Sequence, residues 1–289
     1  MVSYYQMRKN NLPTREVEES FLLHLTGLSR EEFFLTRPVL NPWQKIQYFW
    51  LKRKTTKGYP LQYLFKTAPF YGLNLFVNKN VLIPRIETEL LVEQAIRHLI
   101  SNTKRYANKK KLHVIDVGTG SGCITISLFT KIKKIDPSCA KYADFYAVDV
   151  SLSALKIARQ NAATHRADIK FLESNLLDNP ELPKKFDLIL ANLPYLKSEY
   201  SQKLPKKLAD SLKFEPCIAL DGGRDGLDLI KRLLVQLPGR LDQNGLAILE
   251  IDPDQLKVIE DEFDESLTIR SIRDLNGFDR FICVTNKNE

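Results

Sequence analysis

The chain has 289 residues, of which 44% are apolar and 27% are charged, and its formal net charge is +8. This composition suits one large globular domain with a smaller second one, and it excludes a disordered or repetitive protein. No run approaches the ~20 apolar residues of a membrane-spanning helix. The N-terminal stretch also lacks a signal-peptide pattern, so we expect a cytoplasmic protein without membrane contact.

The residue types that bind metals or stack on nucleic acids are scattered along the chain. The four cysteines and four histidines form no CxxC pair and no histidine cluster, which argues against a metal site. The basic runs at 109–111, 133–134 and 206–207 are short and carry no interleaved aromatic residues. Direct binding of nucleic acid is therefore not expected from these runs. The net positive charge could steer the protein to RNA, to a ribonucleoprotein or to an acidic protein, and charge alone does not decide among these partners.

The chain is expected to divide into three segments. Residues 1–60 are predicted to be a small helical domain, because apolar residues recur at helical spacing in REVEESFLLHLTGL and NPWQKIQYFWLKRK. Residues 61–84 contain two aromatic-rich apolar runs separated by turn residues, which predicts a connecting β-hairpin. The amphipathic pattern RIETELLVEQAIRHLI then predicts a helix that opens the third segment, residues 85–289.

Short apolar strands alternate with amphipathic helices from residue 112 onward. Strands are expected at 112–117, 144–150, 169–174, 186–192, 246–251 and 278–285, and helices at 151–165, 226–237 and 254–263. This alternation predicts an α/β fold with a mostly parallel sheet that is covered by helices on both faces. Ligands of such sheets bind beyond the carboxyl ends of the strands. Three strand ends therefore become candidates for a site: DVGTGSG, VDVS and ANLPY.

The first strand end predicts a cofactor with a nucleotide-like part. VIDVGTGSGCITISL is an apolar strand, then three glycines at alternating positions, then a helix, and glycines there let backbone N–H groups approach a ligand. A dinucleotide loop requires G-x-G-x-x-G, but the third glycine here comes one residue early, and a Walker lysine is absent. At the next strand end, Asp149 can accept both hydroxyls of a ribose. That feature alone does not distinguish a nicotinamide from an S-adenosylmethionine cofactor.

The pattern D-x-G-x-G-x-G resembles the loop of class I S-adenosylmethionine-dependent methyltransferases. The resemblance implies a Rossmann-like fold with a seven-stranded, mostly parallel sheet whose last hairpin adds an antiparallel edge. It also implies that the cofactor ammonium lies beside Asp116 and that the loop backbone packs on the amino-acid part. The adenine would contact Asn175 and Leu176, and Asn192 would lie near the methyl group. The implied cofactor-binding residues are Asp116, Gly118, Thr119, Gly120, Ser121, Gly122, Asp149, Asn175, Leu176 and Asn192.

The third strand end, Asn192-Leu193-Pro194-Tyr195, resembles the [Asn/Asp]-Pro-Pro-aromatic motif of enzymes that methylate a nitrogen attached to a planar π-system. Such a nitrogen is a poor nucleophile, so the site must position it and accept hydrogen bonds from its N–H groups. The side-chain oxygen of Asn192 and the carbonyl of residue 193 would accept these bonds, and Tyr195 would pack on the flat group. Leu193 replaces a proline, but its carbonyl remains, and the following proline keeps it extended.

Four stretches in order resemble the glutamine methyltransferases of peptide-chain release factors (the HemK/PrmC family). They are PLQYLFKTAPFYGLNLFVNKNVLIPRIETELLVEQA, VIDVGTGSGCI, ANLPYL and EPCIALDGGRDGLDLIKRL. The resemblance implies methylation of the glutamine amide in the Gly-Gly-Gln loop of class I release factors. Asn192, Pro194 and Tyr195 would be catalytic, Asn192 to Tyr195 would bind the substrate, and the helical domain would bind the release factor. A monomer is expected.

Two other functions remain open at this point, and several residues have two interpretations. Asn-Leu-Pro-Tyr also occurs in ribosomal RNA adenine dimethyltransferases, although these carry their extra helical domain at the C-terminus. A non-catalytic cofactor-binding module is the other alternative. Arg85, Glu87 and Glu89 could line the cofactor site or could simply favour the start of a helix. Glu215 and the DGGRDG turn are expected to be architectural, with Asp225 as a helix N-cap. The connector at 131–144 has no assigned role.

Overall fold

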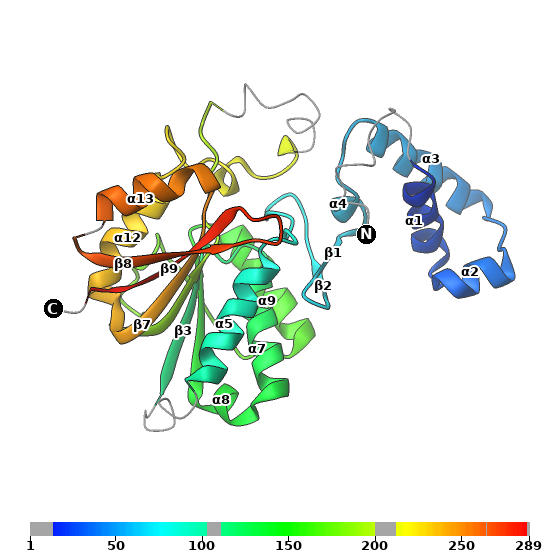
Figure 1. The fold of residues 1–289 in the computed structure, drawn as a ribbon. Coiled ribbons are helices and arrows are strands. Elements are labelled where there is room, and N and C mark those ends of the chain that lie inside the picture. The colour runs from blue at the N-terminus through cyan, green and yellow to red at the C-terminus, as the bar shows by residue number, and fades with distance from the viewer. Residues whose placement is uncertain (1–13, 103–110, 200–211, 264, 288–289) are drawn as a thin grey trace. The chain divides into compact units, whose positions relative to one another are not determined.

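The structure, a computed structural model, describes residues 14–102, 111–199, 212–263 and 265–287. These residues divide into two compact units, one within Met1–Lys66 and Lys206–Phe214 and the other within Thr67–Pro205 and Glu215–Glu289. The first unit is helical, and the second contains a hairpin and the main sheet (Figure 1). No helix in the described part of the chain is long and apolar enough to cross a membrane.

The helical unit contains α1 (Arg15–Thr26), α2 (Arg30–Thr36), α3 (Pro42–Thr56) and α4 (Leu61–Phe65). Thr14, Ser29 and Asn41 cap the first three helices through their side chains, which satisfies N–H groups that a helix start leaves unpaired. The small core of this unit surrounds the fully buried Phe21. The expected helices within residues 1–60 are confirmed.

The expected hairpin is present but shorter than residues 61–84. Its strands are β1 (Thr67–Phe70) and β2 (Leu73–Phe76), which pair in an antiparallel register. Residues 61–65 form α4 instead of a strand, so that part of the prediction is wrong. The physical reason is that the side chains of 61, 64 and 65 pack on the core around Phe21, and tertiary packing overrides an ambiguous apolar pattern.

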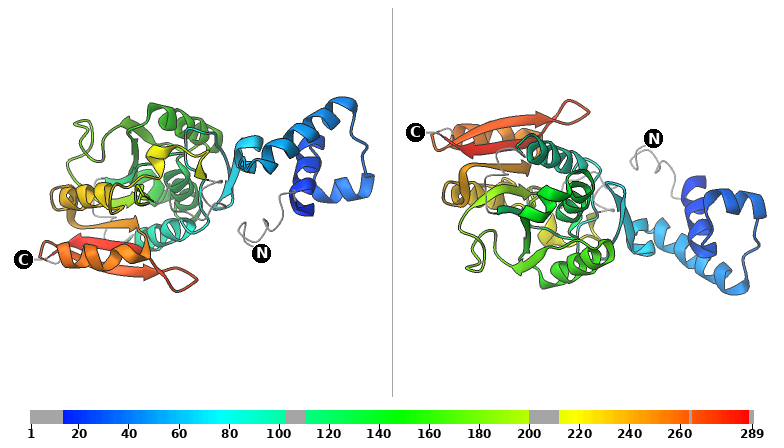
Figure 2. Two further views of the ribbon diagram at one scale, coloured as in Figure 1. Left: turned by 90° about the horizontal axis from the view of Figure 1, so that it is seen from above. Right: turned by 90° about the horizontal axis from the view of Figure 1, so that it is seen from below.

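The main sheet has seven strands in the order β5-β4-β3-β6-β7-β9-β8. Neighbouring strands from β5 to β7 are parallel, whereas β9 runs antiparallel to β7 and to β8. The antiparallel hairpin thus forms one edge of the sheet, as expected, and Figure 2 shows it in orange and red. The strands are β3 (Leu112–Val117), β4 (Ala143–Asp149), β5 (Lys170–Glu173), β6 (Phe186–Ala191), β7 (Leu241–Glu250), β8 (Leu267–Arg273) and β9 (Asp279–Asn286).

Helices cover both faces of this sheet (Figure 1). On one face lie α5 (Glu89–Ser101), α7 (Cys123–Ile135) and α9 (Leu152–His165), and on the other lie α12 (Asp228–Arg240) and α13 (Leu256–Phe263). Successive strand residues point to opposite faces, so Leu188 and Leu190 of β6 belong to one core and Ile189 to the other. Burial on both faces explains why the central strands are apolar runs rather than alternating patterns.

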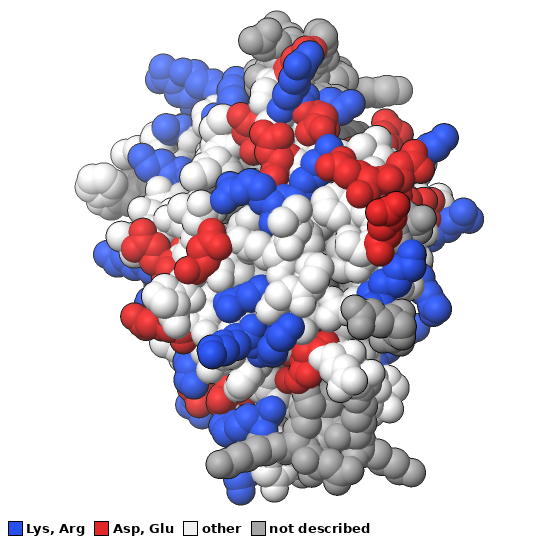
Figure 3. Space-filling model, turned by 90° about the vertical axis from the view of Figure 1, so that its left-hand side faces the viewer, with Lys and Arg blue, Asp and Glu red and all other residues white. Residues whose placement is uncertain are grey.

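The connector at 131–144 is largely helical. Its first residues extend α7, and α8 (Pro137–Tyr142) leads into β4. The surface of the sheet domain that Figure 3 displays carries positive and negative side chains interspersed among the described residues. The surplus positive charge is therefore not gathered into a single stripe on that face.

Candidate active site

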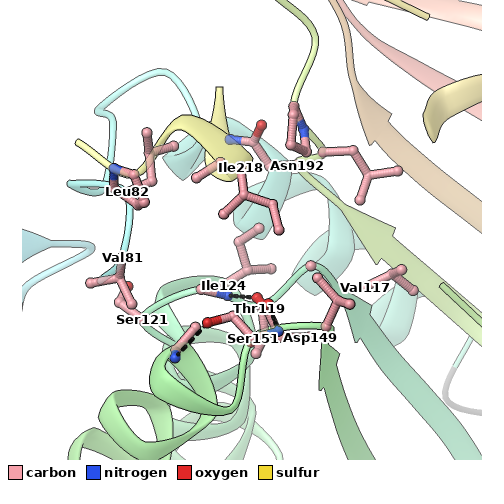
Figure 4. Close-up of a pocket in the computed structure, with 18 of the residues that line it drawn as sticks. Val81, Leu82, Val117, Thr119, Ser121, Ile124, Asp149, Ser151, Asn192 and Ile218 are labelled. Atoms are coloured by element: carbon pink, nitrogen blue, oxygen red, sulfur yellow. Dashed lines mark hydrogen bonds between the residues drawn. The ribbon is translucent and has the colours of Figure 1, made fainter. Parts of the chain in front are cut away.

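A cavity of about 130 Å³ opens at the carboxyl ends of β3, β4, β5 and β6. Its walls come from the segments that follow these four strands, from residues 80–88 and from η1 (Cys217–Ala219). Figure 4 shows Asn192 and Ile218 on one side of the cavity and Thr119, Ser121 and Asp149 on the opposite side. The structure thus brings most of the predicted site residues together; those that line the cavity are Gly118, Thr119, Gly120, Ser121, Asp149, Asn175, Leu176, Asn192, Leu193 and Pro194.

The glycine loop is anchored on both sides. The backbone N–H groups of Gly118 and Thr119 both donate to the Val148 carbonyl of β4 at 2.9 Å. On the far side, the Ser121 carbonyl accepts a hydrogen bond from Asn161 of α9, also at 2.9 Å. The hydroxyl of Ser121 is buried beside the cavity, next to the thiol of Cys123.

Gly118 is required by its conformation and by its neighbour. Its φ is +73°, a left-handed value that side chains with a Cβ rarely adopt. A Cβ at this position would also lie 2.9 Å from the Cδ2 atom of Leu193. The glycine loop and the Asn-Leu-Pro-Tyr segment are thus packed directly on each other.

Asp116 and Gly122 support the loop and are not among the described residues that line the cavity. Oδ2 of Asp116 accepts a hydrogen bond from the Thr119 hydroxyl at 2.7 Å, and the residue is 1% exposed. Burial raises the pKa of Asp116 to about 7. Gly122 is the N-cap of α7 in a left-handed conformation. The cofactor-binding role of both residues stays a prediction.

Asp149 presents a preoriented carboxyl group at the end of β4. Oδ2 accepts the Gly120 N–H and Oδ1 accepts the Ser151 N–H, both at 2.9 Å. Each carboxylate oxygen keeps a further lone pair for a ligand hydroxyl. Burial raises the pKa of Asp149, although the backbone bonds partly offset this effect. The N-cap of α9 is Ser151, whose side chain accepts a hydrogen bond from the Ala154 N–H. Asp149 is therefore not needed as a helix cap.

Asn175 and Leu176 follow β5 at the edge of the cavity. Oδ1 of Asn175 accepts a hydrogen bond from Arg232 at 3.0 Å, which leaves its second lone pair available. Leu176 has a positive φ of 53°, an uncommon conformation for a side chain of this size. Its backbone is therefore held in place by the surrounding structure.

Some of the four residues after β6 line the cavity, and others have side chains that point into the buried interior. Asn192 lines the cavity and donates from Nδ2 to the hydroxyl of Thr88 at 2.9 Å. The side chain of Leu193 is 4% exposed and belongs to the main core. Tyr195 is not among the described residues lining this cavity, and its hydroxyl donates to Glu250 at 3.3 Å. The packing of Tyr195 on a flat substrate group stays a prediction.

The DGGRDG turn packs against the Asn-Leu-Pro-Tyr segment and the residue that follows it. The Gly222 N–H donates to the Leu196 carbonyl at 2.8 Å, and the Leu196 N–H donates to the Leu220 carbonyl at 3.1 Å. A Cβ on Gly222 would lie 2.6 Å from the Pro194 carbonyl oxygen, so only glycine permits this approach. These contacts support the architectural interpretation of the turn.

The prediction that Asp225 is a helix N-cap is wrong. The helix α12 begins at Asp228, and its N-cap is Leu227 without a side-chain bond. Asp225 instead accepts the Leu227 N–H at 2.9 Å, which closes a local turn before the helix.

Arg85 and Glu215 form an ion pair at 2.6 Å, in which the Glu215 side chain is 3% exposed and the Arg85 side chain is 32% exposed. Glu215 also accepts the Ile83 N–H. Arg85 is one of the residues that line the cavity. Glu89 accepts the Tyr71 N–H at 2.7 Å and thus supports the hairpin.

Sequence reasoning missed Thr88, which lines the cavity, and Glu250, which contacts Thr88 from behind it. The hydroxyl of Thr88 donates to Oε2 of Glu250 at 2.7 Å, and both residues are buried. Burial raises the pKa of Glu250 to about 7, and it also raises the pKa of Tyr195. One available signal was an acid at the end of an apolar strand, the pattern that identified Asp149.

Known proteins resemble this chain both in sequence and in fold. A family model described as a methyltransferase domain matches residues 108–238. The release factor glutamine methyltransferase of Bacillus anthracis is 31% identical over 270 residues, which cover 91% of this chain and 90% of that protein. That of Flavobacterium psychrophilum is 32% identical, with coverages of 93% and 92%.

One solved structure shares the fold at low identity. The hMettl16 catalytic domain in complex with MAT2A 3'UTR hairpin 6 has a TM-score of 0.54 and 17% sequence identity, and the match covers 76% of this chain and 77% of that one. This likeness concerns the fold alone. Together with the family model, it confirms the expected α/β methyltransferase architecture.

Proposed function

Because this chain belongs to the release factor glutamine methyltransferase family, we propose that it transfers a methyl group from S-adenosyl-L-methionine to the side-chain amide nitrogen of a release-factor glutamine. The observation that carries the proposal is the position of Asn192 on the cavity wall opposite Asp149 and the glycine loop (Figure 4). A methyl donor held by the loop would thus face the polar groups that can hold an amide.

The residues that line the cavity fit S-adenosyl-L-methionine. Asp149 would accept the ribose hydroxyls, since both of its oxygens are oriented by backbone N–H groups. The backbone of the glycine loop, with Ser121 among the residues that line the cavity, would bind the amino-acid part. Asn175 and Leu176 would contact the adenine, and Asp116 would act on the cofactor ammonium through the loop that it supports. When bound, the cofactor supplies an electrophilic methyl group on a positively charged sulfur.

The protein's contribution to the chemistry is positioning and electrostatics. An amide nitrogen is a poor nucleophile because its lone pair is delocalised into the carbonyl. The Asn192 side-chain oxygen and the Leu193 carbonyl would accept hydrogen bonds from the two N–H groups of the substrate amide. These bonds hold the nitrogen toward the methyl group and stabilise the positive charge that develops on it. The proton can leave after transfer, when the nitrogen has become acidic.

The protein substrate is a class I release factor, and the reacting glutamine is that of its Gly-Gly-Gln loop. Residues 1–60 would bind the body of the release factor, residues 61–84 would connect the two parts, and residues 85–289 would carry out the reaction. The net charge of +8 could speed the encounter with an acidic partner. This activity belongs in the cytoplasm, where release factors act.

The proposal is tested by incubating the protein with labelled cofactor and a release factor, followed by mass spectrometry of the Gly-Gly-Gln peptide. We expect a single added methyl group on the glutamine side chain. Asn192→Ala should abolish the label while the far-ultraviolet circular dichroism stays unchanged. A parallel reaction contains ribosomal RNA. Label in the RNA alone, or on another residue of the release factor, would overturn the proposal.

A further inference from the structure

The carboxamide of Asn192 can face a substrate with its oxygen or with its NH₂ group, and only the oxygen can accept a hydrogen bond from an amide N–H. We infer that Thr88 and ionised Glu250 are positioning residues that hold Asn192 with its oxygen directed to the substrate. This inference rests on the proposed function, because the group to be recognised is the N–H of the glutamine amide.

Three side chains from distant parts of the sequence form one chain of hydrogen bonds. Nδ2 of Asn192 donates to Oγ1 of Thr88 at 2.9 Å, and that hydroxyl donates to Oε2 of Glu250 at 2.7 Å. A threonine hydroxyl has a single hydrogen. Because the Glu250 carboxylate takes that hydrogen, Thr88 can only accept from Asn192. The NH₂ group must therefore face Thr88, and Oδ1 must point the other way.

Thr88 precedes α5 with a helical backbone conformation (φ −65°, ψ −17°), so its side chain does not cap the helix. The residue is 2% exposed. The hydroxyl is committed to Glu250 and Asn192 instead, as the inferred role requires.

Glu250 lies at the carboxyl end of β7, and it is 1% exposed. Its second oxygen accepts the Tyr195 hydroxyl at 3.3 Å, so both oxygens act as acceptors. Burial raises the pKa of Glu250 to about 7, while the bonds from Thr88 and Tyr195 oppose this increase. The other groups that act on it electrostatically are Arg280 of β9, Glu87 before α5, and the thiol of Cys123 in α7.

Protonation of Glu250 would remove the constraint on direction. A proton on Oε2 would be donated to Oγ1 of Thr88, and the Thr88 hydrogen would then be free to bond Oδ1 of Asn192. That arrangement turns the NH₂ group toward the substrate, where it opposes the amide N–H. The rate should therefore fall as the pH decreases below about 7, although Glu250 touches neither substrate nor cofactor.

Matched variants of Thr88 test the first half of the inference. Thr88→Val keeps the shape and removes the hydroxyl, and we expect kcat to fall by about 10–100-fold with little change in the KM for S-adenosylmethionine. Thr88→Ser restores the hydroxyl and should recover most of kcat. An unchanged kcat in Thr88→Val, or equal losses in both variants, would overturn the assignment.

The pH profile of Glu250→Gln tests the second half. At saturating cofactor, kcat of the wild-type protein should show an acid limb with a midpoint near 7, and Glu250→Gln should lack it. Saturation separates this limb from the titration of Asp116, which supports the cofactor loop. The side-chain NH₂ signal of Asn192 in ¹⁵N-labelled protein should shift with the same midpoint in the wild type only. The inference is refuted by an identical acid limb in the variant.

These outcomes are distinguishable from failure of the proposed function. If the wild-type protein methylates no release-factor glutamine, the proposed function fails. If it does so and Thr88→Val is as fast as the wild type, the function stands and only the inferred orientation of Asn192 is wrong.

Discussion

Replacement of Glu250 by glutamine should stabilise the protein in a pH-dependent manner. The pKa of this carboxyl group is raised from 4.5 in the unfolded chain to about 7 in the fold, and burial is the main cause. The folded protein therefore keeps the proton between these two values, while the unfolded chain has lost it. Stability from this group is fully present below about pH 4.5, declines as the pH rises, and is lost above about pH 7.

The size of the effect follows from the two pKa values. Each pKa unit corresponds to about 1.36 kcal/mol, and the unfolded carboxyl is mostly ionised at about pH 5. The linkage relation then gives a loss of about 2–3 kcal/mol in the free energy of unfolding of the wild-type protein between about pH 5 and pH 8. A glutamine at this position does not titrate. The stability of Glu250→Gln relative to the wild type should thus increase by about 2–3 kcal/mol over that range.

The assay must report on the sheet domain. The two tryptophans, Trp43 and Trp50, both lie in the helical unit, so their fluorescence would follow the wrong part of the chain. Urea unfolding of both proteins at the two pH values should be followed by far-ultraviolet circular dichroism, with hydrogen exchange of the β7 amides as a second probe. Asp116 and Asp149 titrate in both proteins and cancel in the difference. A stability difference that is the same at both pH values would refute the reasoning.

Three further substitutions test other contacts of the site. Asp149→Asn places an NH₂ group against backbone N–H donors, so calorimetry should show S-adenosylmethionine binding weakened by about tenfold or more. Gly222→Ala pushes a methyl group against the backbone of Pro194, so kcat should fall by about 100-fold while cofactor affinity is retained, and equal kcat would contradict this. Arg85→Met removes the charge partner of Glu215, which keeps the Ile83 N–H bond, so thermal or urea unfolding should show a loss of about 1–3 kcal/mol, and an unchanged stability would contradict it.

The central strands could be predicted because both of their faces are buried. β3 and β6 are mainly apolar and almost wholly buried, and each is followed by a glycine or a polar residue. The sequence of β8, LTIRSIR, gives no such signal, because the strand lies at the edge of the sheet and most of its residues are exposed. An edge strand with two arginines lacks the apolar pattern of a buried strand.

The clustering of the glycine loop, Asp149 and Asn175 around one cavity was predictable, because these residues lie at adjacent strand ends. Thr88, Asn192 and Glu250 could not be connected in this way. The Asn192–Thr88 bond joins residues 104 positions apart, and the Thr88–Glu250 bond joins residues 162 positions apart. No local pattern encodes such a contact, since it depends on how α5 and β7 approach the end of β6.

The contacts also explain why the flanking motifs accompany the Asn-Leu-Pro-Tyr segment. Thr88 of IPRIETE bonds Asn192, while Gly222 of the DGGRDG turn packs against the backbone at Pro194. Arg85 and Glu215 then tie the upstream motif to the downstream one. The separate stretches of resemblance are therefore parts of one packed structure around the Asn-Leu-Pro-Tyr segment.

Glu250 is subject to two opposing demands in that structure. A neutral side chain would be more stable in its buried position, whereas the direction of the Thr88 hydroxyl requires a charged acceptor. A protein selected for stability alone would lose the carboxylate, because about 2–3 kcal/mol is a substantial part of the stability of a typical domain. If Glu250→Gln is both more stable above neutral pH and insensitive to acid in its rate, the two effects share one cause. The buried charge would then be retained because it fixes the hydrogen-bond acceptor that the glutamine amide needs.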